Sequence, residues 1–290
     1  MGFPFPPIMA ANPDNDGLMS AAAYRRFAGA PPTDPTDPIS TAGASGTYSE
    51  ATVTTVVSTL TPAITNLTYR RCHDLGHAAT RTLVPLMLCP GFGGSGNAFT
   101  TTTLRRFASY AFLVIVPTTR GRGSVSGALH YAGDTQDALD ILVAAVAAAT
   151  SAGATVLGEG LCAGWLGAST GALDVGLMAS RVPEAVLFAV FLYPNHDLGV
   201  DPEDGYWGLT STAVRSSLTT QVGDRAQGAA AAVDPYPALD VPTALPRILA
   251  LPECGIMAWV GGDETEAPQV PITSPSRLVR DLRAAVGPQA

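Results

Sequence analysis

The chain has 290 residues, 47% of them hydrophobic, and 24 acidic against 16 basic side chains give it a formal net charge of −8. This composition supports a substantial buried core, and an acidic chain without a basic cluster argues against nucleic-acid binding by electrostatics. The sequence contains no uninterrupted apolar stretch approaching the roughly 18 residues of a membrane-spanning helix, and we expect no secretion signal at its N-terminus.

The first 66 residues differ in character from the rest. Leu18–Phe27 is a short helix candidate, and the proline-rich residues 31–38 indicate an extended linker. A second helix is predicted after Ser49, which is a suitable N-cap. The spacing of Val53, Val56, Val57 and Leu60 would place their apolar side chains on one face of that helix. We interpret residues 1–66 as an N-terminal arm for attachment or oligomerisation.

From residue 67 onward, strand-like and helix-like segments alternate. The expected strands are Leu67–Cys72, Thr82–Cys89, Ala111–Val116, Leu161–Leu166, Val186–Tyr193 and Gly255–Val260. The expected helices are one capped by Asp134, with Leu139, Leu142, Val143 and Val146 on one face, then Gly171–Arg181 and Pro275–Val286. This alternation predicts an α/β fold with a mostly parallel sheet, helices on both faces, and ligands beyond the carboxyl ends of the strands.

A strand-to-helix turn at residues 167–171, Gly-Ala-Ser-Thr-Gly, is the first candidate for chemistry. In a nucleophile elbow a serine occupies a sharp, strained turn, and glycines on both sides leave room for close packing. An apolar strand before the turn and a helix after it fit that context, so Ser169 is the candidate nucleophile. Residues 160–164, Gly-Leu-Cys-Ala-Gly, have the same form around Cys162, but the helix after Cys162 would contain several costly glycines.

Two further turns follow expected strands. The glycine-rich residues 89–96 can aim a backbone N–H at a developing oxyanion, with Phe92 as our choice, Gly93 as the alternative and Thr170 as the second donor. After the strand that ends at Val260, Asp263 is the candidate acid that orients a base, with Glu264 and Glu266 as alternatives.

These elements, in this order, resemble the α/β-hydrolase superfamily over about residues 67–286. The Arg-Gly-Arg-Gly-Ser turn at 120–124 and the Gly-Asp-Thr-Gln-Asp-Ala segment at 133–138 resemble its prolyl-peptidase and acyl-peptidase branch. The resemblance implies esterase or peptidase chemistry by Ser169 and Asp263 with the Phe92 and Thr170 amides. It also implies a cap over residues 197–250, in which Tyr206 and Trp207 line the pocket, in a domain that spans residues 67–290.

The base of that family is a histidine after the last strand, and no histidine follows Asp263, which indicates a C-terminally shortened fold. His196, after the Val186–Tyr193 strand, is the substitute that we favour, although a loop histidine without a catalytic role is the commoner case. His130 is a candidate for the substrate pocket. The pair His73 and His77 fits a turn better than a metal site, and we expect no metal and no cofactor; a partner subunit is another source of the base.

Residues 16–22, Asp-Gly-Leu-Met-Ser-Ala-Ala, resemble a short motif of phage tail-fibre and minor tail proteins. We therefore expect a virion-associated, homo-oligomeric tail protein that carries a serine-hydrolase domain and acts on a small ester or amide or on a cell-envelope substrate. One alternative is a catalytically inactive scaffold that binds a receptor or glycan. Another is a free-standing cytoplasmic esterase.

Overall fold

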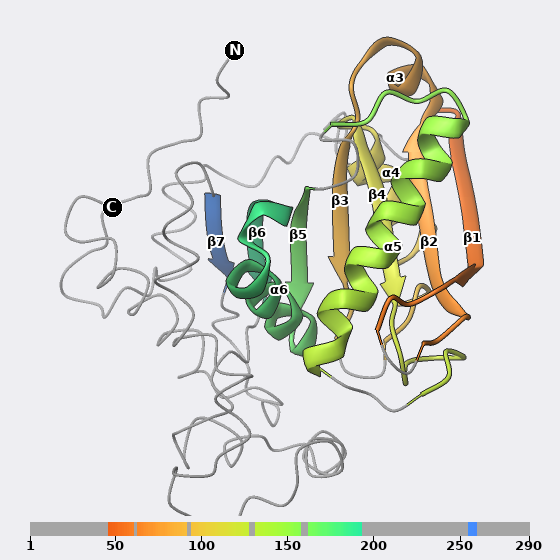
Figure 1. Cartoon of the computed structure of the whole chain (residues 1–290). Helices are drawn as coiled ribbons and strands as arrows, with labels where there is room; N and C mark the ends of the chain where they lie inside the picture. The colour runs from red at the N-terminus through yellow and green to blue at the C-terminus, as the bar shows by residue number, and fades with distance from the viewer. Residues whose placement is uncertain are drawn as a thin grey trace, which may run out of the picture.

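The structure, a computed structural model, describes residues 46–60, 63–91, 94–127, 131–157, 162–192 and 255–259. Seven strands form one sheet in the order β1-β2-β4-β3-β5-β6-β7 (Figure 1). The strands are β1 (Tyr48–Val56), β2 (Leu67–Asp74), β3 (Val84–Cys89), β4 (Phe112–Thr118), β5 (Ala163–Ala168), β6 (Val186–Leu192) and β7 (Gly255–Trp259). The helices are α3 (Leu75–Thr80), α4 (Thr101–Ala108), α5 (Tyr131–Ser151) and α6 (Thr170–Arg181), with a 3-10 turn at Pro183–Ala185.

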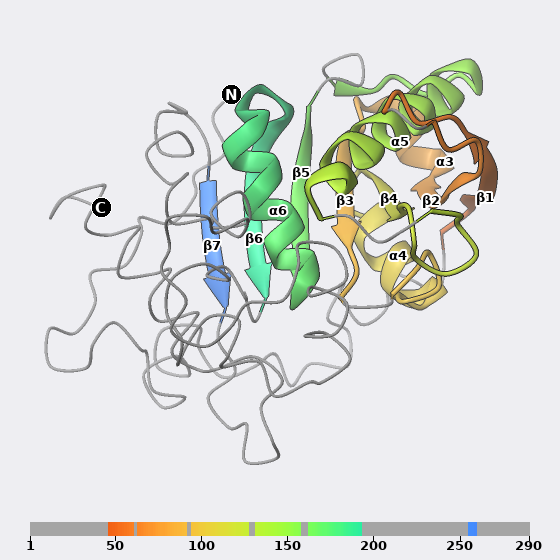
Figure 2. The ribbon, with the colours of Figure 1, turned by 60° about the horizontal axis from the view of Figure 1, so that its bottom comes forward.

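The strands β4, β3, β5, β6 and β7, which are neighbours in that order, run parallel to one another. Strand β2 is antiparallel to both β4 and β1. In the register of the sheet, Cys89 of β3 lies opposite Gly167 of β5, and Ala168 of β5 lies opposite Leu192 of β6. The last residues of these three neighbouring strands therefore meet at one edge of the sheet, as Figure 2 shows for the arrowheads of β5 and β6. The carboxyl edge of a parallel sheet is where such folds place ligands.

Helices cover both faces of the sheet, as the sequence predicts. In Figure 1, α5 and α6 lie in front of the sheet and α4 lies behind it. Along β3, Met87 belongs to the core under α5 and α6, and its neighbours Leu86 and Leu88 belong to the core under α4. All three side chains are almost fully buried, which explains why this strand is a continuous apolar run.

The prediction of a helix after Ser49 is wrong, because Tyr48–Val56 forms the edge strand β1. Glu50 lies opposite Cys72 and Val53 lies opposite Tyr69 in the antiparallel pairing with β2. This segment is rich in threonine and valine, whose branched side chains favour strands and weaken helices. Part of the expected arm is thus built into the sheet, and residues 1–45 lie outside the described residues.

Helix α5 begins at Tyr131, so the prediction that Asp134 caps it is wrong. Leu142 and Val146 are buried against the sheet, but Val143 is 50% exposed and does not share their face. One residue along a helix turns the side chain by about 100°, which carries Val143 away from the stripe that Leu142 and Val146 define. In the described part of the chain, no helix combines the length and the apolar character that crossing a membrane requires.

The residues after His73 form helix α3, where the sequence indicates only a turn. The Asp74 carboxylate accepts hydrogen bonds from the backbone N–H groups of Gly76 and His77 and so caps the helix. His73 lies in β2 and His77 in α3, so the two side chains do not share one helix. The expected helix Pro275–Val286 and the expected cap 197–250 lie outside the described residues.

Candidate functional site

Ser169 lies between the end of β5 and the start of α6, with φ of 55° and ψ of −121°. Among the described residues other than glycine, only Ser169 and Ala111 have a positive φ. Side chains crowd the backbone in this region, so such a conformation persists only where the surrounding structure enforces it. Here the Ser169 N–H donates to the Leu192 carbonyl of β6 at 2.9 Å, and the Ala172 N–H donates to the Ser169 carbonyl at 2.9 Å. The strained turn that the sequence predicts at this serine is confirmed.

The two glycines that flank Ser169 are required by close packing of the backbone. A Cβ added to Gly167 would lie 2.1 Å from the Gly171 carbonyl oxygen, and one added to Gly171 would lie 2.2 Å from the Cys89 carbonyl oxygen. A real Cβ atom essentially never lies so close to another heavy atom, so neither position accepts a residue larger than glycine without a shift of the backbone. The Gly-x-Ser-x-Gly spacing therefore allows β5, the turn and α6 to pack against the end of β3.

The competing cysteine motif does not form an elbow. Cys162 stands directly before β5, and the residues that follow it, Ala163–Ala168, continue as a strand instead of starting a helix. Burial also raises the pKa of the Cys162 thiol, which reduces the fraction of thiolate, the nucleophilic form of cysteine. This alternative from the sequence is wrong.

Thr170 opens helix α6 and is 4% exposed. The first backbone N–H groups of a helix have no partner within the helix, and they lie at the positive end of its dipole. The Thr170 Oγ1 has no hydrogen-bond partner among the described residues. The helix thus presents the Thr170 amide beside the serine, in a position that suits an anion.

The turn after β3 approaches the serine from the other side. A Cβ added to Gly91 would lie 3.5 Å from the Ser169 Cβ, so the two backbones are in near contact. The Gly94 N–H donates to the Gly91 carbonyl at 2.9 Å and closes the turn. Phe92 and Gly93, the candidate donors to an oxyanion, lie outside the described residues, and their role stays a prediction.

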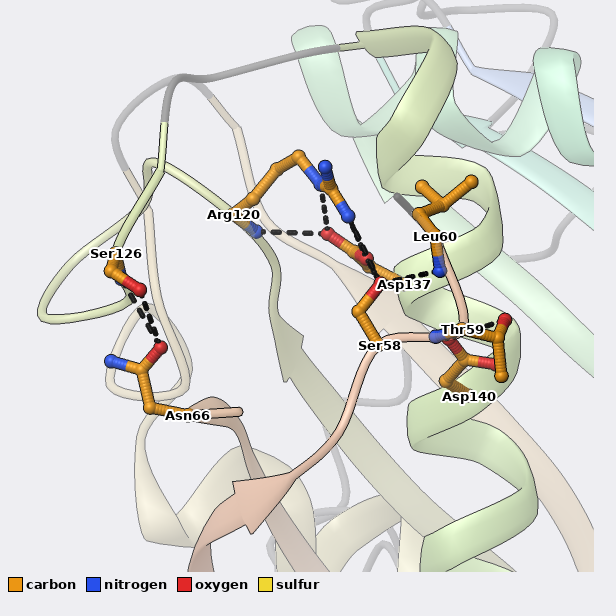
Figure 3. A network of polar contacts seen from close by, with 8 residues as sticks. All are labelled: Ser58, Thr59, Leu60, Asn66, Arg120, Ser126, Asp137 and Asp140. Carbon is orange, nitrogen blue, oxygen red and sulfur yellow. Dashed lines mark hydrogen bonds and ion pairs between the residues drawn. The ribbon is translucent and has the colours of Figure 1, made fainter. Parts of the chain in front are cut away.

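Arg120, in the turn after β4, belongs to a buried polar network (Figure 3). Its Nε lies 2.7 Å from Asp137 Oδ2 and its Nη2 lies 2.8 Å from Asp137 Oδ1, while the same Nη2 donates to Ser58 Oγ at 3.0 Å. The Ser58 hydroxyl in turn donates to Asp137 Oδ1 at 2.7 Å. Asp137 is fully buried on α5, so this network ties the turn to α5 and to the segment after β1.

Arg122, two residues along the same turn, points to a different set of partners. Its Nη2 lies 2.8 Å from Asp174 Oδ2 on α6, and its Nη1 donates to the Pro90 carbonyl at 3.2 Å. The side chain is only 3% exposed. The sequence analysis does not identify the pairing of Arg122 with Asp174. The one signal for it in the sequence is a second arginine in the turn that follows the buried strand β4.

Two of the four histidines lie at the opposite edge of the sheet from Ser169. Because β2 is antiparallel to β4, its last residues lie level with the amino end of the parallel strands, and α3 continues from there. His73 is buried, and this burial, with the neighbouring Arg71, lowers its pKa. His77 Nε2 lies 2.8 Å from the Ser109 carbonyl oxygen.

The remaining predicted site residues, which are Asp263, His196, His130 and Trp207, lie outside the described residues. Within the part of the chain that the structure describes, no group of three or more histidine, cysteine, aspartate or glutamate side chains is arranged to hold a metal ion. The part of the candidate site that the structure describes consists of Ser169, Thr170 and the turn at Gly91.

No protein-family model matches the sequence, and no curated protein matches it. Solved structures do match the fold. A serine-to-alanine variant of the esterase Est22 gives a TM-score of 0.56 at 11% identity, covering 84% of this chain and 70% of that chain. A candidate dienelactone hydrolase from Klebsiella pneumoniae gives 0.50 at 12% identity, covering 83% of this chain and 82% of that chain.

A further alignment, with the esterase Est22 itself, has a TM-score of 0.42 at 14% identity and covers 57% of this chain. There the chain spans about half of the length of that esterase, 49%. At such low identity the likeness concerns the fold alone. The mostly parallel sheet with helices on both faces, together with the overall likeness to these two hydrolase structures, shows that the chain has the α/β-hydrolase fold.

Proposed function

We propose that the protein is a serine hydrolase of the esterase or peptidase type that forms an acyl-enzyme on Ser169. The observation that carries this proposal is the strained backbone of Ser169 at the carboxyl edge of the sheet, with flanking glycines that nothing larger can replace. Such strain costs free energy, and proteins retain it chiefly where it serves a site. A turn of this kind exposes the serine hydroxyl beside the amides of a helix N-terminus.

The proposed reaction has two steps. The Ser169 Oγ attacks the carbonyl carbon of an ester or amide while a base accepts the hydroxyl proton, and the carbonyl oxygen becomes an oxyanion. The Thr170 N–H and an N–H of the turn after β3, for which we propose Phe92, donate to that oxyanion; each such donor contributes about 10²–10³ in rate. The intermediate then expels the alcohol or amine, which takes the proton from the base, and water hydrolyses the acyl-serine by the same route.

Within one chain, the base is His196 or His130, because His73 and His77 lie at the far edge of the sheet. We propose His196, oriented by Asp263. His196 follows β6 in the sequence, and β6 pairs directly with β5 and ends level with Ala168. Removing one member of a serine–histidine–acid triad typically lowers the rate by about 10⁴ or more.

Hydrolysis of short-chain p-nitrophenyl esters by the full-length protein tests the proposal. We expect Ser169→Ala and His196→Ala to lower kcat by about 10⁴ or more and His130→Ala to have a smaller effect. Ser151→Ala, at the exposed end of α5, is the matched serine control and keeps the full rate. Equal rates for Ser169→Ala and the unaltered protein would contradict the proposal; loss of activity in His130→Ala alone would transfer the role of base to His130.

The attachment role rests on the sequence of the arm. We propose that residues 1–45 join the domain to other copies of the chain or to other virion proteins, because the segment at 16–22 resembles phage tail proteins. The segment 48–56 belongs to the sheet as β1, so we assign the attachment role to residues 1–45. Deletion of residues 1–45 should convert an oligomer into a monomer, as light scattering would show. A full-length chain that is already monomeric would contradict this part of the proposal.

A further inference from the structure

Arg122 connects three segments that meet around the serine. It stands in the turn after β4, it contacts Asp174 in α6, and it donates to the Pro90 carbonyl after β3. Cys89 and Pro90 also pack directly on Gly171, where an added Cβ would lie within 2.7 Å of the Pro90 carbonyl oxygen. One buried guanidinium thus links the two backbone segments that flank Ser169.

The hydrogen bond to Pro90 fixes the orientation of a peptide group beside the nucleophile. In a planar trans peptide the carbonyl and the following N–H point in opposite directions, so holding the Pro90 carbonyl also sets the direction of the Gly91 N–H. Gly91 is the residue in near contact with the Ser169 Cβ. Rotation of this peptide group would change the backbone surface that faces a bound substrate.

The ion pair with Asp174 has an electrostatic consequence as well. Asp174 lies in the second turn of α6 and its side chain is 13% exposed, so water screens its charge poorly. The negative charge of this carboxylate opposes the negative charge that develops on a substrate oxygen near the start of the helix. The Arg122 guanidinium, 2.8 Å away, neutralises it.

From these contacts we infer that Arg122 is a positioning residue, which holds the Pro90–Gly91 peptide in register with Ser169 and neutralises Asp174. The inference rests on the proposed hydrolase function for its kinetic consequence, but its structural part concerns the backbone alone. The planar guanidinium can serve the Pro90 carbonyl and Asp174 at the same time, whereas a lysine ammonium is a single point of charge.

The experiment compares Arg122→Gln and Arg122→Lys with Arg106→Gln, which removes an exposed arginine of α4. Ester hydrolysis gives kcat and KM, and hydrogen exchange resolved to single amides gives the local order. The reporter amides are those of Gly94, bonded to the Gly91 carbonyl, and Ser169, bonded to the Leu192 carbonyl. The Leu83 amide, bonded to Thr155 at the far edge of the sheet, is the internal reference.

We expect Arg122→Gln to lower kcat by about 10- to 100-fold with little change in KM, since small misplacements of reacting groups cost rates of this order. Exchange at Gly94 should rise while exchange at Leu83 does not. Arg122→Lys should keep the melting temperature close to normal through its pairing with Asp174, yet lose kcat to a similar extent. A merely structural arginine would instead lose stability and kcat together and recover both in the lysine variant.

Unchanged kcat and unchanged Gly94 exchange in folded Arg122→Gln would overturn the inference. Should the glutamine variant fail to fold, full kcat in Arg122→Lys would overturn it equally. If the unaltered protein hydrolyses no ester, the proposed function fails by that result, and the exchange at Gly94 alone then decides whether Arg122 orders the turn.

Discussion

Arg120 and Arg122 stand in one turn, and each forms an ion pair with an aspartate, but the two pairs join different parts of the molecule. Arg120 binds Asp137 and Ser58, which belong to α5 and to the segment after β1. Arg122 binds Asp174 and the Pro90 carbonyl, both packed around the serine turn. The role of each buried ion pair therefore follows from the segments that it connects.

The largest effect on stability is expected at Asp137. Its side chain is fully buried and its partner Arg120 is 9% exposed, so removing Asp137 takes a two-point ionic partner away from a buried guanidinium. Asp137→Ala should lower the free energy of unfolding by about 3–5 kcal/mol, measured by urea denaturation. Arg106→Gln, on the surface of α4, is the control and should stay within about 0.5 kcal/mol. A loss below about 1 kcal/mol for Asp137→Ala would contradict a stabilising role for the Arg120–Asp137 pair.

Double-mutant cycles sharpen the separation of the two pairs. Arg122 and Asp174 touch, so their combined substitution should show a coupling of about 1–3 kcal/mol in unfolding free energy. Arg122 pairs with Asp174 whereas Asp137 pairs with Arg120, so the effects of substituting Arg122 and Asp137 should add to within about 0.5 kcal/mol. Strong coupling in the second cycle would mean that the turn acts as one unit and that the division of roles is wrong.

The smallest effect is expected at His73, a buried basic side chain of a different kind. Burial is the main reason why the pKa of His73 lies below 6.5. The nearby charge of Arg71 lowers the pKa further, and the charge of Asp74 raises it. The folded state then binds its proton less readily than the unfolded state. The contribution to stability is present above pH 6.5 and is lost as the pH falls through the lowered pKa of the folded protein.

Unfolding free energies measured from pH 7.5 down to pH 5 test this prediction. His73→Gln should flatten the decline on the acid side, whereas Ser151→Ala, which removes a non-ionisable side chain at the exposed end of α5, should leave its slope unchanged. Identical pH slopes for the His73 variant and the unaltered protein would contradict it. That result would imply a partner that stabilises the charged imidazole of His73, as Asp137 and Asp174 stabilise the two arginines.

The sequence predicted the alternating core well, because β3, β4 and β6 are largely apolar runs between turn residues. It also located the turn at Ser169, since the two glycines occur at the spacing that close backbone packing demands. It failed at β1, where valine and threonine at helical spacing fit a helix pattern as well as a strand, and only the pairing with β2 decides between them.

The ion pairs lay beyond sequence reasoning for a different reason. Arg122 and Asp174 are separated by 52 positions, and Arg120 and Asp137 by 17. Spacing along the chain predicts neighbours only within one helix or one strand. The near contact of Gly91 with Ser169 likewise depends on the order β3-β5 in the sheet, which brings Cys89 opposite Gly167.

Reaction of the native protein with a fluorophosphonate, followed by mass spectrometry of its peptides, tests most directly whether the strained turn activates its serine. We predict one stoichiometric adduct, located on Ser169, that is absent after heat denaturation and absent in Ser169→Ala. A native protein that acquires no adduct, or that carries it on another residue, would contradict the account.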